Sequence, residues 1–506
     1  MKPIKKILIA NRGEIAVRII RTCREMDIIP VAIFSETDER ALHVRLAEEA
    51  YAIGGKTAAE SYLLQDKILQ VAIKCGADAI HPGYGFLSEN AEFAERVAAS
   101  GIIFIGPCGQ AMRTMGDKTS ARQAMQNAGI PIVPGTAEPL VSYRDALPVA
   151  QEIGYPILLK AAAGGGGKGM RVVTKADDME SSFRAAASEA VSAFGDGRVY
   201  IEKYLEDPRH IEFQIMADSH GNAIYLGERE CSIQRRHQKV VEEAPSVVLT
   251  PAMREEMGKT AIQVAQACNY ENAGTIEFLV DRHLDFYFLE MNTRLQVEHP
   301  VTEMVTGTDL VRMQIEVAEG RALKLSQSDV KCDGHAIECR IYAEDPDTNF
   351  MPSTGTIDYL FRPDGPGVRE DTGVVQGDKI SLYYDPMLSK LVVKAETRDL
   401  AIQRMKRALR EYRIMGIQTT IPFCLWVLEH PNFINGNFTT HFVEKHFNKA
   451  DDIDLQGLSE EEENSAAIAV ALFHEALEKR HVPENSSTKA QRGHSTAWKL
   501  RGWKNR

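Results

Sequence analysis

Four consecutive glycines, Gly164–Gly167, constrain the fold of this chain more than any other feature of its sequence. Glycine costs roughly 0.5–1 kcal/mol more than alanine in a regular element, so the run needs a structural or functional reason. The flanking segments read YPILLKA (155–161) and MRVVT (170–174), and their apolar, β-branched character is typical of strands. We therefore predict a strand–loop–strand hairpin, with a flexible linker as the alternative.

The loop of this hairpin is suited to phosphate. A P-loop requires GxxxxGK[ST] at the start of a helix; Gly164 and Gly169 have that spacing, but Met170 and a β-branched segment follow. Backbone amides without side chains approach phosphate oxygens closely, and Lys160 and Lys168 add positive charge. The pattern predicts a glycine-rich flap that closes over a phosphate-bearing ligand.

Two strands further along the chain carry paired acids. They read TIEFLV (275–280) and DFYFLEMN (285–292). A hairpin that turns at His283–Leu284 places Glu277 opposite Glu290, with Asn292 on the same face. Carboxylate and amide oxygens are the ligands that Mg²⁺ prefers, and unpaired acids between apolar strands are costly to bury. The sequence predicts a metal site here; a surface strand with ion pairs is the alternative.

Two charged stretches surround this hairpin in sequence. RLQVEHP places Arg294, Gln296 and Glu298 on alternate positions, where a guanidinium, an amide and a carboxylate grip a small planar oxyanion and remove its proton. The segment ERECSIQRRHQKVVEEAP (228–245) concentrates charge. Taken alone, this second stretch is interpreted as a solvated charged surface.

The first ~115 residues alternate short apolar strands with amphipathic helices. The predicted strands are Lys6–Ala10, Pro30–Ser35, Ala79–His81 and Ile102–Ile105, and the first helix is Glu14–Met26. Alternation of this kind predicts a doubly wound parallel sheet. The sequence NRGEIAVR follows the first strand instead of GxGxxG, so a dinucleotide site is not predicted.

Composition excludes several classes of protein. The net charge of −12 provides no basic field for nucleic acid, and no apolar run approaches the ~18 residues of a membrane helix. The first residues predict a strand and not a signal peptide. Eight cysteines without a CxxC pair indicate buried thiols in a reducing compartment, so we expect a cytoplasmic protein. From the net charge and the lack of a long apolar run, we expect no nucleic-acid or membrane partners.

Several long motifs resemble the biotin carboxylases, which are ATP-grasp enzymes, over residues 6 to about 445. The matching stretches are ANRGEIAVR, HPGYGFLSEN, GDK, KAAAGGGGKGMR, EKYLEDPRHIE, QRRHQKVVEEAP, EMNTRLQVEHPVTE and GHAIECRIYAEDP. The resemblance implies an α/β fold with a Rossmann-like N-terminal sheet, an ATP-grasp domain with a mobile lid, and a mixed α+β C-terminal domain. The expected boundaries are 1–117, 118–330 with the lid at about 134–204, 331–446, and a tail at 447–506 with one helix and a basic end.

The resemblance also implies roles for residues at the matching positions. The expected ATP-binding residues are Lys118, Lys160, Gly165, Gly166, Gly167, Met170, Glu202, Lys203, Leu205, His210, Gln234, His237, Glu277 and Glu290. The expected ligands of Mg²⁺ or Mn²⁺ are Glu277, Glu290 and Asn292. The expected bicarbonate and biotin residues are Lys239, Arg294, Gln296, Val297, Glu298, Arg340 and Tyr84, of which Lys239, Arg294, Glu298 and Arg340 are catalytic.

The implied reaction is ATP- and bicarbonate-dependent carboxylation of biotin N1 through carboxyphosphate, the first half-reaction of an acetyl-CoA, other acyl-CoA or pyruvate carboxylase. Glu298 is the expected base for bicarbonate, and Arg340 is expected to stabilise the ureido oxyanion of biotin. Tyr84 contacts biotin or packs the HPGYGF turn, and both readings stay open. Cys231 has no expected chemical role.

The expected partners follow from what the sequence lacks. The Ala/Val-Met-Lys-Met biotinylation motif is absent, and the internal Met405-Lys406 lies in a predicted helix, Arg398–Arg413. We therefore expect a separate biotin carrier and a carboxyltransferase subunit. The resemblance implies a homodimer formed through the helix face of Arg18, Arg21 and Glu25. The tail, whose helix opens with a capping box at Ser459 and Glu462, is solvated or docks a partner. The alternatives for function are another ATP-grasp ligase and a nucleotide-binding regulatory subunit.

Overall fold

The structure is a computed structural model that describes residues 3–136, 138–161, 170–194, 197–236, 238–447, 468–469 and 471–473. The chain divides into two units, Met1–Phe447 and Asn448–Arg506. In the second unit, the described residues 468–469 and 471–473 are helical and exposed, within the helix predicted there. The predicted capping box at Ser459 lies outside the described residues.

The N-terminal segment forms the predicted parallel sheet, in the order β3-β2-β1-β4-β5. Its strands are β1 (Lys6–Ile9), β2 (Ile29–Phe34), β3 (Glu49–Ala52), β4 (Ala79–His81) and β5 (Ile103–Phe104). The surrounding helices are α1 (Gly13–Glu25), α2 (Leu42–Leu46), α3 (Gln65–Cys75), α4 (Ala91–Ala99) and α5 (Gly109–Gly116). Apolar side chains of β1 and α1 share one core, as the alternating pattern requires.

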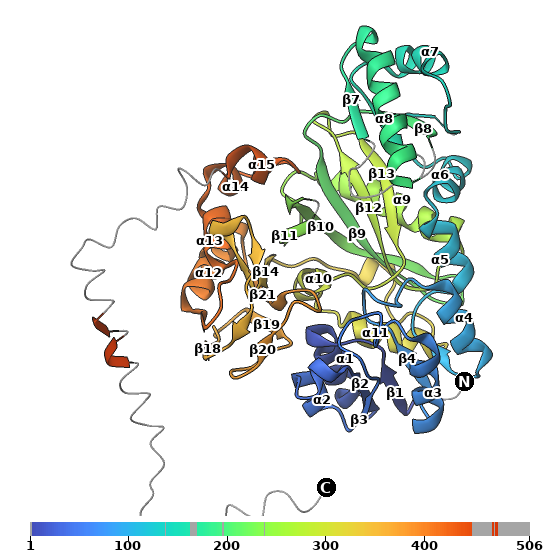
Figure 1. Cartoon of the computed structure of the whole chain (residues 1–506). Coiled ribbons are helices and arrows are strands. Elements are labelled where there is room, and N and C mark those ends of the chain that lie inside the picture. Colours follow the sequence, from blue (N-terminus) through green and yellow to red (C-terminus); the bar gives the residue numbers. More distant parts are fainter. Residues whose placement is uncertain are drawn as a thin grey trace, which may run out of the picture. The chain divides into compact units, whose positions relative to one another are not determined.

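The glycine-rich segment joins two strands of a small antiparallel sheet, so the hairpin prediction is confirmed. The sheet has the order β7-β6-β8, with β6 at Ile157–Ala161, β7 at Met170–Val173 and β8 at Val199–Lys203. Helices α7 (Tyr143–Ile153) and α8 (Met179–Phe194) cover one face, where Ile157, Leu159 and Ile201 form the core (Figure 1). Period-two alternation places Lys160 and Glu202 on the opposite face.

An eight-stranded sheet in the order β13-β12-β9-β10-β11-β14-β21-β19 dominates the rest of the unit. Its strands are β9 (Arg209–Ala217), β10 (Ala223–Arg235), β11 (Gln238–Ala244), β12 (Asn272–Val280), β13 (Phe286–Asn292), β14 (His335–Tyr342), β19 (Val368–Thr372) and β21 (Met387–Ala395). Because β11 pairs directly with β14, the ladder continues across the boundary expected at residue 330. The residues on either side of that boundary therefore share one sheet.

Helices pack on both faces of this sheet. They include α6 (Lys118–Asn127), α9 (Pro251–Ala267), α10 (His299–Thr306), α11 (Leu310–Ala318), α12 (Arg398–Glu411), α13 (Ile421–Glu429), α14 (Pro431–Ile434) and α15 (Phe442–His446). Odd-numbered residues of β14, such as Ile337 and Cys339, face α12 and α13 in an apolar core. Even-numbered residues face α10, where Ala336 packs on Val301. The polar side chains of β14 therefore lie on the α10 side.

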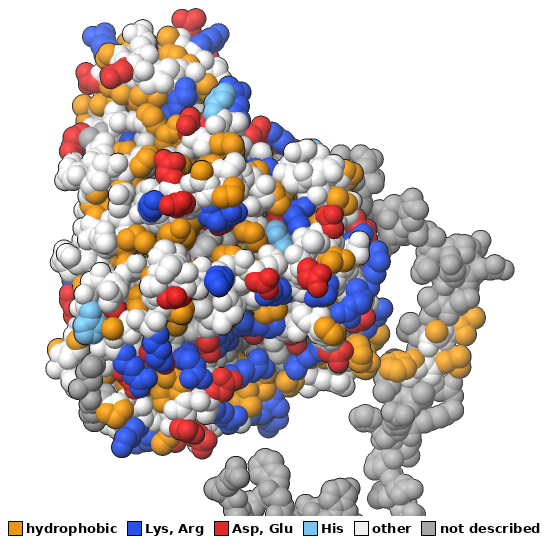
Figure 2. Space-filling view, turned by 180° about the vertical axis from the view of Figure 1, so that it is seen from behind, with side chains coloured by type: hydrophobic (Ala, Val, Ile, Leu, Met, Phe, Trp, Pro, Cys, Tyr) orange, Lys and Arg blue, Asp and Glu red, His pale blue; other side chains and the backbone are white. Residues whose placement is uncertain are grey.

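Short pairs complete the fold: β15 (Glu344–Asp345) with β16 (Met351–Pro352), β17 (Gly355–Thr356) with β20 (Lys379–Ile380), and β18 (Tyr359–Phe361) with β22 (Arg413–Met415). No described helix is both long enough and apolar enough to cross a membrane. On the face shown in Figure 2, acidic and basic side chains are interspersed.

The segment at residues 130–136 connects the small sheet to the large one. Phe288 N of β13 donates to Pro131 O at 2.7 Å, and Lys203 N of β8 donates to Pro134 O at 2.7 Å. One extended segment thus runs along the edges of both sheets. It links the strand of the predicted metal ligands to the strand of Glu202.

Candidate functional site

The predicted acidic pair lies on the hairpin of β12 and β13. Glu277 is the register partner of Glu290, and Thr275 is the partner of Asn292. Register partners in an antiparallel ladder project to the same face of the sheet. Glu277 is buried and Glu290 is exposed, so this pair extends from the interior of the site toward solvent.

Several side chains converge on Glu277. Asn292 Nδ2 and Gln296 Nε2 donate to its Oε1 at 2.9 and 2.7 Å, and Lys239 Nζ lies 3.0 Å from the same oxygen. His210 Nε2 lies 3.0 Å from Oε2. Burial alone would raise the pKa of Glu277, but Lys239 and His210 outweigh it and hold that pKa well below its ordinary value. The carboxylate is therefore ionised, as a metal ligand must be.

The donor atoms fit a hard divalent cation. Glu277 and Glu290 offer carboxylate oxygens, and Asn292 offers Oδ1, which here accepts from Arg294 Nη2 at 2.9 Å. Glu212 adds a carboxylate that the sequence analysis missed, with Oε2 lying 3.9 Å from His210 Nε2. An all-oxygen set of this kind suits Mg²⁺ or Mn²⁺ better than a softer metal.

Lys239 joins the acidic pair to the predicted base. Its Nζ donates to Glu298 Oε1 at 2.6 Å and also bonds Glu212. Burial would lower the pKa of this amine, but Glu212, Glu277 and Glu298 raise it well above its ordinary value. A permanently charged ammonium therefore lies among three carboxylates.

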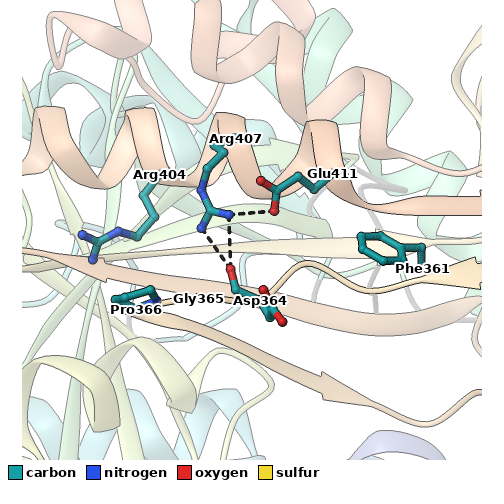
Figure 3. A pocket seen from close by; sticks show the side chains of 7 residues that line it. All are labelled: Phe361, Asp364, Gly365, Pro366, Arg404, Arg407 and Glu411. Carbon is teal, nitrogen blue, oxygen red and sulfur yellow. Dashed lines mark hydrogen bonds and ion pairs between the residues drawn. The ribbon is translucent and has the colours of Figure 1, made fainter.

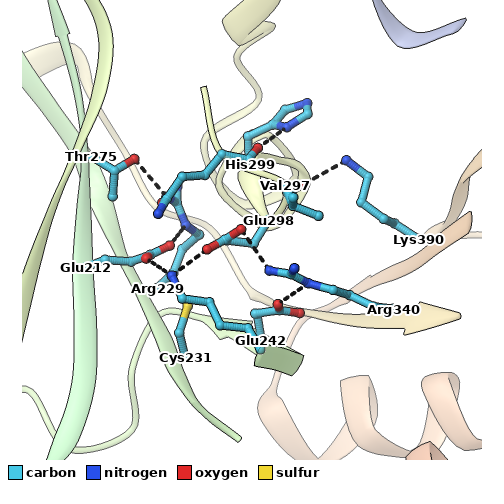
Figure 4. A network of polar contacts seen from close by, with 12 residues as sticks. Glu212, Arg229, Cys231, Glu242, Thr275, Val297, Glu298, His299, Arg340 and Lys390 are labelled. Carbon is cyan, nitrogen blue, oxygen red and sulfur yellow. Dashed lines mark hydrogen bonds and ion pairs between the residues drawn. The ribbon is translucent and has the colours of Figure 1, made fainter. Parts of the chain in front are cut away.

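Glu298 lies between two cations, Lys239 and Arg340, which come from different parts of the chain. Figure 4 shows Glu298 with Arg340 on one side of it. Opposite Lys239, Arg340 of β14 donates from Nη2 to Glu298 Oε2 at 2.9 Å and from Nε to Glu242 Oε1 at 2.6 Å. Burial alone would raise the pKa of Glu298, but Lys239, Arg340 and Arg229 hold it well below its ordinary value. The predicted base is thus ionised and oriented by two charge-assisted hydrogen bonds.

A buried arginine that the sequence analysis did not assign organises this region. Arg229 is fully buried and donates to Glu212, Gln214, Thr275, Gln296 and Thr302. Its bond to Gln296 Oε1 is 2.6 Å long and fixes the amide that donates to Glu277. Arg229 therefore positions two polar side chains of the site without being exposed to a ligand.

The interpretation of residues 228–245 as a solvated charged surface is wrong. These residues form β10 and β11 in the middle of the large sheet, and Glu228, Glu230, Glu242 and Glu243 are buried. Their charges are matched from neighbouring elements, as when Arg254 of α9 donates to Glu228 at 2.8 Å. Consecutive charged residues such as Glu242 and Glu243 are buried on opposite faces of the sheet, where Arg340 pairs with the first and Arg398 with the second.

Arg294 is held by another residue that the sequence analysis missed. Glu89 Oε2 accepts from Arg294 Nε at 2.9 Å, and Glu89 Oε1 accepts from Thr293 N at 3.0 Å. Glu89 belongs to the HPGYGFLSEN segment, far away in sequence. The contact orients the guanidinium beside Asn292. The residue predicted to bind the anion therefore lies next to a residue predicted to bind the metal.

The predicted nucleotide residues of the small sheet are partly paired with one another. Lys160 Nζ bonds Glu202 Oε2, and Met170 is the register partner of Lys160. Lys203 Nζ instead donates to Gly154 O at 2.8 Å, which ties β8 to the start of β6. Lys160, Glu202 and Met170 thus share the face opposite α7 and α8.

The structure describes only some of the other residues that are predicted to bind the nucleotide. Gln234 Nε2 donates to Cys231 O at 2.8 Å, and Leu205 is half-buried just after β8. Lys118 is the first residue of α6, behind the Asp117 N-cap. The side chain of Lys118, all of Gly165–Gly167 and His237 lie outside the described residues.

Tyr84 packs against the N-terminal core, and no described residue hydrogen-bonds its buried hydroxyl. Lys390 Nζ lies 5.7 Å from the centre of its ring. Lys390 is fully buried and donates to Val297 O at 2.7 Å. Tyr84 therefore packs the turn while lying next to a lysine that holds the Val297 backbone.

The thiol of Cys231 is buried, and burial raises its pKa well above the ordinary value, so it is not a nucleophile.

A surface hollow beside α12 does not share residues with this cluster (Figure 3). It is lined by Phe361, Asp364, Gly365, Pro366, Arg404, Arg407 and Glu411. Arg407 donates to Asp364 O at 3.2 Å and to Glu411 Oε2 at 2.6 Å, so its charge is neutralised locally.

Comparison with known proteins gives a consistent result over most of the chain. Three family models match: biotin carboxylase, N-terminal domain, at residues 3–112; carbamoyl-phosphate synthase L chain, ATP binding domain, at 117–326; and biotin carboxylase C-terminal domain at 338–445. A biotin carboxylase of Nostoc sp. is 55% identical over 87% of this chain and 98% of its own length. A pyruvate carboxylase subunit of Methanothermobacter thermautotrophicus is 52% identical over 90% of this chain and 93% of its own length.

Solved structures agree. The biotin carboxylase of Campylobacter jejuni, in a β,γ-ATP complex, superposes with a TM-score of 0.82 at 52% identity, covering 88% of this chain and 99% of that one. The biotin carboxylase domain dimer of Hydrogenobacter thermophilus 2-oxoglutarate carboxylase, in complex with MgADP, ADP and bicarbonate, has a TM-score of 0.82 at 47% identity, covering 89% and 99%.

Proposed function

Because this chain belongs to the biotin carboxylase family of ATP-dependent ligases, we propose that its site carboxylates N1 of biotin with ATP and bicarbonate by way of carboxyphosphate. The observation that carries the proposal is the position of Glu298, bonded to Lys239 on one side and to Arg340 on the other. One carboxylate thus lies between a cation beside the acidic pair and a cation from β14.

ATP binds between the small sheet and the acidic hairpin in this proposal. Lys160 and Lys118 contact phosphates, the Gly165–Gly167 segment covers them, and the remaining nucleotide contacts come from Met170, Glu202, Lys203, Leu205, His210, Gln234 and His237. Lys160 then exchanges its ion pair with Glu202 for a phosphate oxygen. Glu277, Glu290 and Asn292 hold Mg²⁺ or Mn²⁺, which neutralises phosphoryl charge during transfer.

Bicarbonate lies against Arg294, Gln296, Val297 and Lys239. The fork of Arg294, held by Glu89, matches two oxygens of the anion. Glu298 takes the proton, so that bicarbonate can attack the γ-phosphate of ATP. Its low pKa keeps the carboxylate ionised before the transfer, and Lys239 stabilises the anion that results.

The carboxyphosphate then yields CO₂ and phosphate, and phosphate removes the proton from biotin N1. Arg340 stabilises the oxyanion that develops on the ureido oxygen of biotin. Its guanidinium is buried, so its charge is little screened by water. Tyr84, next to Lys390, lies on the biotin side of this site.

ATP hydrolysis tests the proposal and separates it from its rivals. We expect hydrolysis that requires both bicarbonate and free biotin, with carboxybiotin as product. Hydrolysis that needs an amine or a different carboxylate, with no response to biotin, would support another ATP-grasp ligase. Binding of ATP without turnover would support a regulatory subunit.

The biotin is carried by a separate protein, and a carboxyltransferase subunit consumes the carboxybiotin. The internal Met405-Lys406 supports this, because it lies within helix α12, where Met405 is buried in the core and Lys406 pairs with Glu429 at 3.0 Å. Acetyl-CoA, another acyl-CoA and pyruvate all remain candidate acceptors. Mass spectrometry of the proteins that co-purify with the native chain identifies the complex and therefore the acceptor.

A homodimer is part of the proposal, with a changed interface. Arg18 does not project to a second subunit, because it is buried and donates to Glu303 and Asp309 of its own chain at 2.7 and 2.8 Å. Arg21 and Glu25 are exposed on α1 and remain available for the dimer interface.

We also propose that the 451–506 tail docks a partner subunit. Its deletion should leave carboxylation of free biotin intact and weaken complex assembly; unchanged co-purification would contradict this.

The domain boundaries expected at 117, 330 and 446 are supported by family matches at 3–112, 117–326 and 338–445. A cytoplasmic location is supported by the eight cysteines, all of them within the described residues and all of them free thiols.

A further inference from the structure

A buried acid that the proposed reaction does not use lies directly behind Arg340. Glu338 is on β14, two residues before Arg340, and its side chain projects to the same face of the sheet. It is fully buried, and neither of its carboxyl oxygens accepts a hydrogen bond from any described residue. A buried carboxylate in that state is unusual, because buried charges are normally paired or neutralised.

The nearest acid across the ladder is equally buried. Glu242 of β11 is the register partner of Glu338, so the two side chains lie next to each other on one face. Glu242 Oε1 accepts from Arg340 Nε, but its Oε2 also has no partner among the described residues. Three carboxyl oxygens thus lie in a closed interior with no donor, unless one of them carries a proton.

Charged groups from every neighbouring element face Glu338. Arg340 comes from β14 itself and Lys390 from β21, while α10 contributes Glu298 at its N-cap. His299 follows Glu298 on α10. Lys390 is already engaged by Val297 O and by Glu14 of α1, whose Oε2 lies 3.3 Å away. Burial holds the pKa of His299 well below its ordinary value, so this histidine stays neutral. The cations near Glu338 are therefore committed to other acids.

We propose that Glu338 is a positioning residue of the carboxylation site: as a neutral acid it shares one proton with Glu242 and leaves the charge of Arg340 free to meet an oxyanion. The inference rests on the proposed role of Arg340. Its physical basis is that a second ionised carboxylate behind the guanidinium would oppose negative charge developing in front of it. A hydroxyl of Glu338 donated to Glu242 also supplies the missing hydrogen bond.

Titration supports this picture. Burial raises the pKa of Glu338 well above the usual value; Lys390 and Arg340 oppose this shift, and the neighbouring Glu242 adds to it. Burial likewise raises the pKa of Glu242, to about 7, against the pull of Arg340. Two acids this close titrate as a pair that holds one proton near neutral pH and loses it in alkaline solution.

The test compares the pH dependence of biotin carboxylation in the full-length protein and in Glu338→Gln. Glutamine keeps the shape and the donor but cannot ionise. We expect the wild-type rate to fall about tenfold per pH unit above the apparent pKa of the pair, and the Glu338→Gln rate to stay level there. Glu230→Gln is the matched control, because it removes a buried acid paired with Arg209, and its profile should follow the wild type. Identical alkaline limbs in all three proteins would overturn the proposal.

Infrared spectroscopy gives a second readout that does not depend on turnover. The wild-type protein should show the carbonyl stretch of a buried protonated carboxylic acid that is absent from Glu338→Gln. If that variant does not fold, the wild-type band alone is followed: its loss with rising pH should coincide with the loss of carboxylation. A band that persists while the rate falls contradicts the proposal. Normal carboxylation by Arg340→Ser would instead show that the proposed role of Arg340 is wrong.

Discussion

Arg340 donates from Nη2 to Glu298 Oε2 at 2.9 Å, so the residue expected to stabilise an oxyanion is hydrogen-bonded to the residue expected to remove a proton. The two come from different parts of the chain, Arg340 from β14 and Glu298 from the turn before α10. The bond couples the steps of the proposed reaction, because protonation of Glu298 weakens its hold on Arg340.

Arg340→Ser should bind ATP normally and lose biotin carboxylation by roughly 10²–10³-fold, the usual cost of removing one oxyanion donor. Because Arg340 also neutralises Glu242 and Glu298, the variant should be destabilised by about 3–5 kcal/mol. Steady-state kinetics and denaturant unfolding measure both effects. Arg254→Ser, which removes a half-buried arginine paired with Glu228, is the control and should retain carboxylation. Near-normal carboxylation by Arg340→Ser would remove the assignment.

Glu298→Gln should slow bicarbonate-dependent ATP cleavage, because glutamine cannot accept the proton. The pKa of wild-type Glu298 is held below its ordinary value, so Glu298 stays ionised well into the acid range. The acid limb of the wild-type rate profile should therefore not report its protonation. Ionised Glu298 contributes its full stabilisation at pH values above its pKa in the unfolded chain. That stabilisation is lost only as the pH falls through the lower pKa that Glu298 has in the folded protein. Unchanged turnover of the variant would count against the base role.

Glu89→Gln should raise the KM for bicarbonate and leave the KM for ATP unchanged. The ion pair with Arg294 is partly exposed, with side-chain exposures of 42% for Glu89 and 21% for Arg294, so it contributes only about 0.5–1 kcal/mol, a roughly two- to fivefold effect. Initial-rate measurements with each substrate varied in turn give both constants. An equal rise in both would indicate a general distortion of the site.

Lys390→Met should destabilise the fold by about 3–5 kcal/mol, because Glu14 loses the cation beside it in the interior. Burial raises the pKa of Glu14 to about 7 even with Lys390 present. Without the lysine, Glu14 must be protonated to stay buried, so the loss should be greater in alkaline than in acidic buffer. Denaturant unfolding across pH measures this. Lys390→Met combined with Glu14→Leu should recover much of the stability; no recovery would show that the two residues act separately.

In His43→Gln, the free energy of unfolding should decrease less as the pH falls than it does in the wild type. His43 is buried in α2, and burial lowers its pKa from 6.5 to about 4 despite nearby Asp38. The unfolded chain binds this proton first, so the wild-type free energy of unfolding falls as pH drops from 6.5 toward 4. The difference between these two pKa values corresponds to at most ~3.4 kcal/mol. The exposed His283→Gln is the control and should keep the wild-type slope.

Local pattern predicted much of this architecture. Strand and helix alternation identified the parallel sheet to within a residue or two at β1, β2 and β4, and period-two alternation identified the facing acids Glu277 and Glu290. Both patterns follow from side-chain direction along a single element. They therefore need no knowledge of distant partners.

Residues brought in by pairing of distant strands escaped prediction. Arg229 and Glu242 lie in strands so charged that they resemble a surface, and only the ladder of β10, β11 and β14 shows that they are interior. Glu89 and Lys390 reach the site from segments hundreds of residues away from Arg294 and Glu14, respectively. The neighbouring residues in the sequence do not indicate with which distant residue each of them pairs.

The unbroken ladder from β11 to β14 also limits how this enzyme can be taken apart. A chain cut at residue 330 would leave Glu298 on one fragment and Arg340 on the other, and neither fragment would hold a complete reaction centre. Co-expressed fragments should regain turnover only after the open strand edges pair again. The fragment concentration at which carboxybiotin synthesis returns would measure how tightly the β11–β14 ladder and the side-chain contacts around it hold the two fragments together.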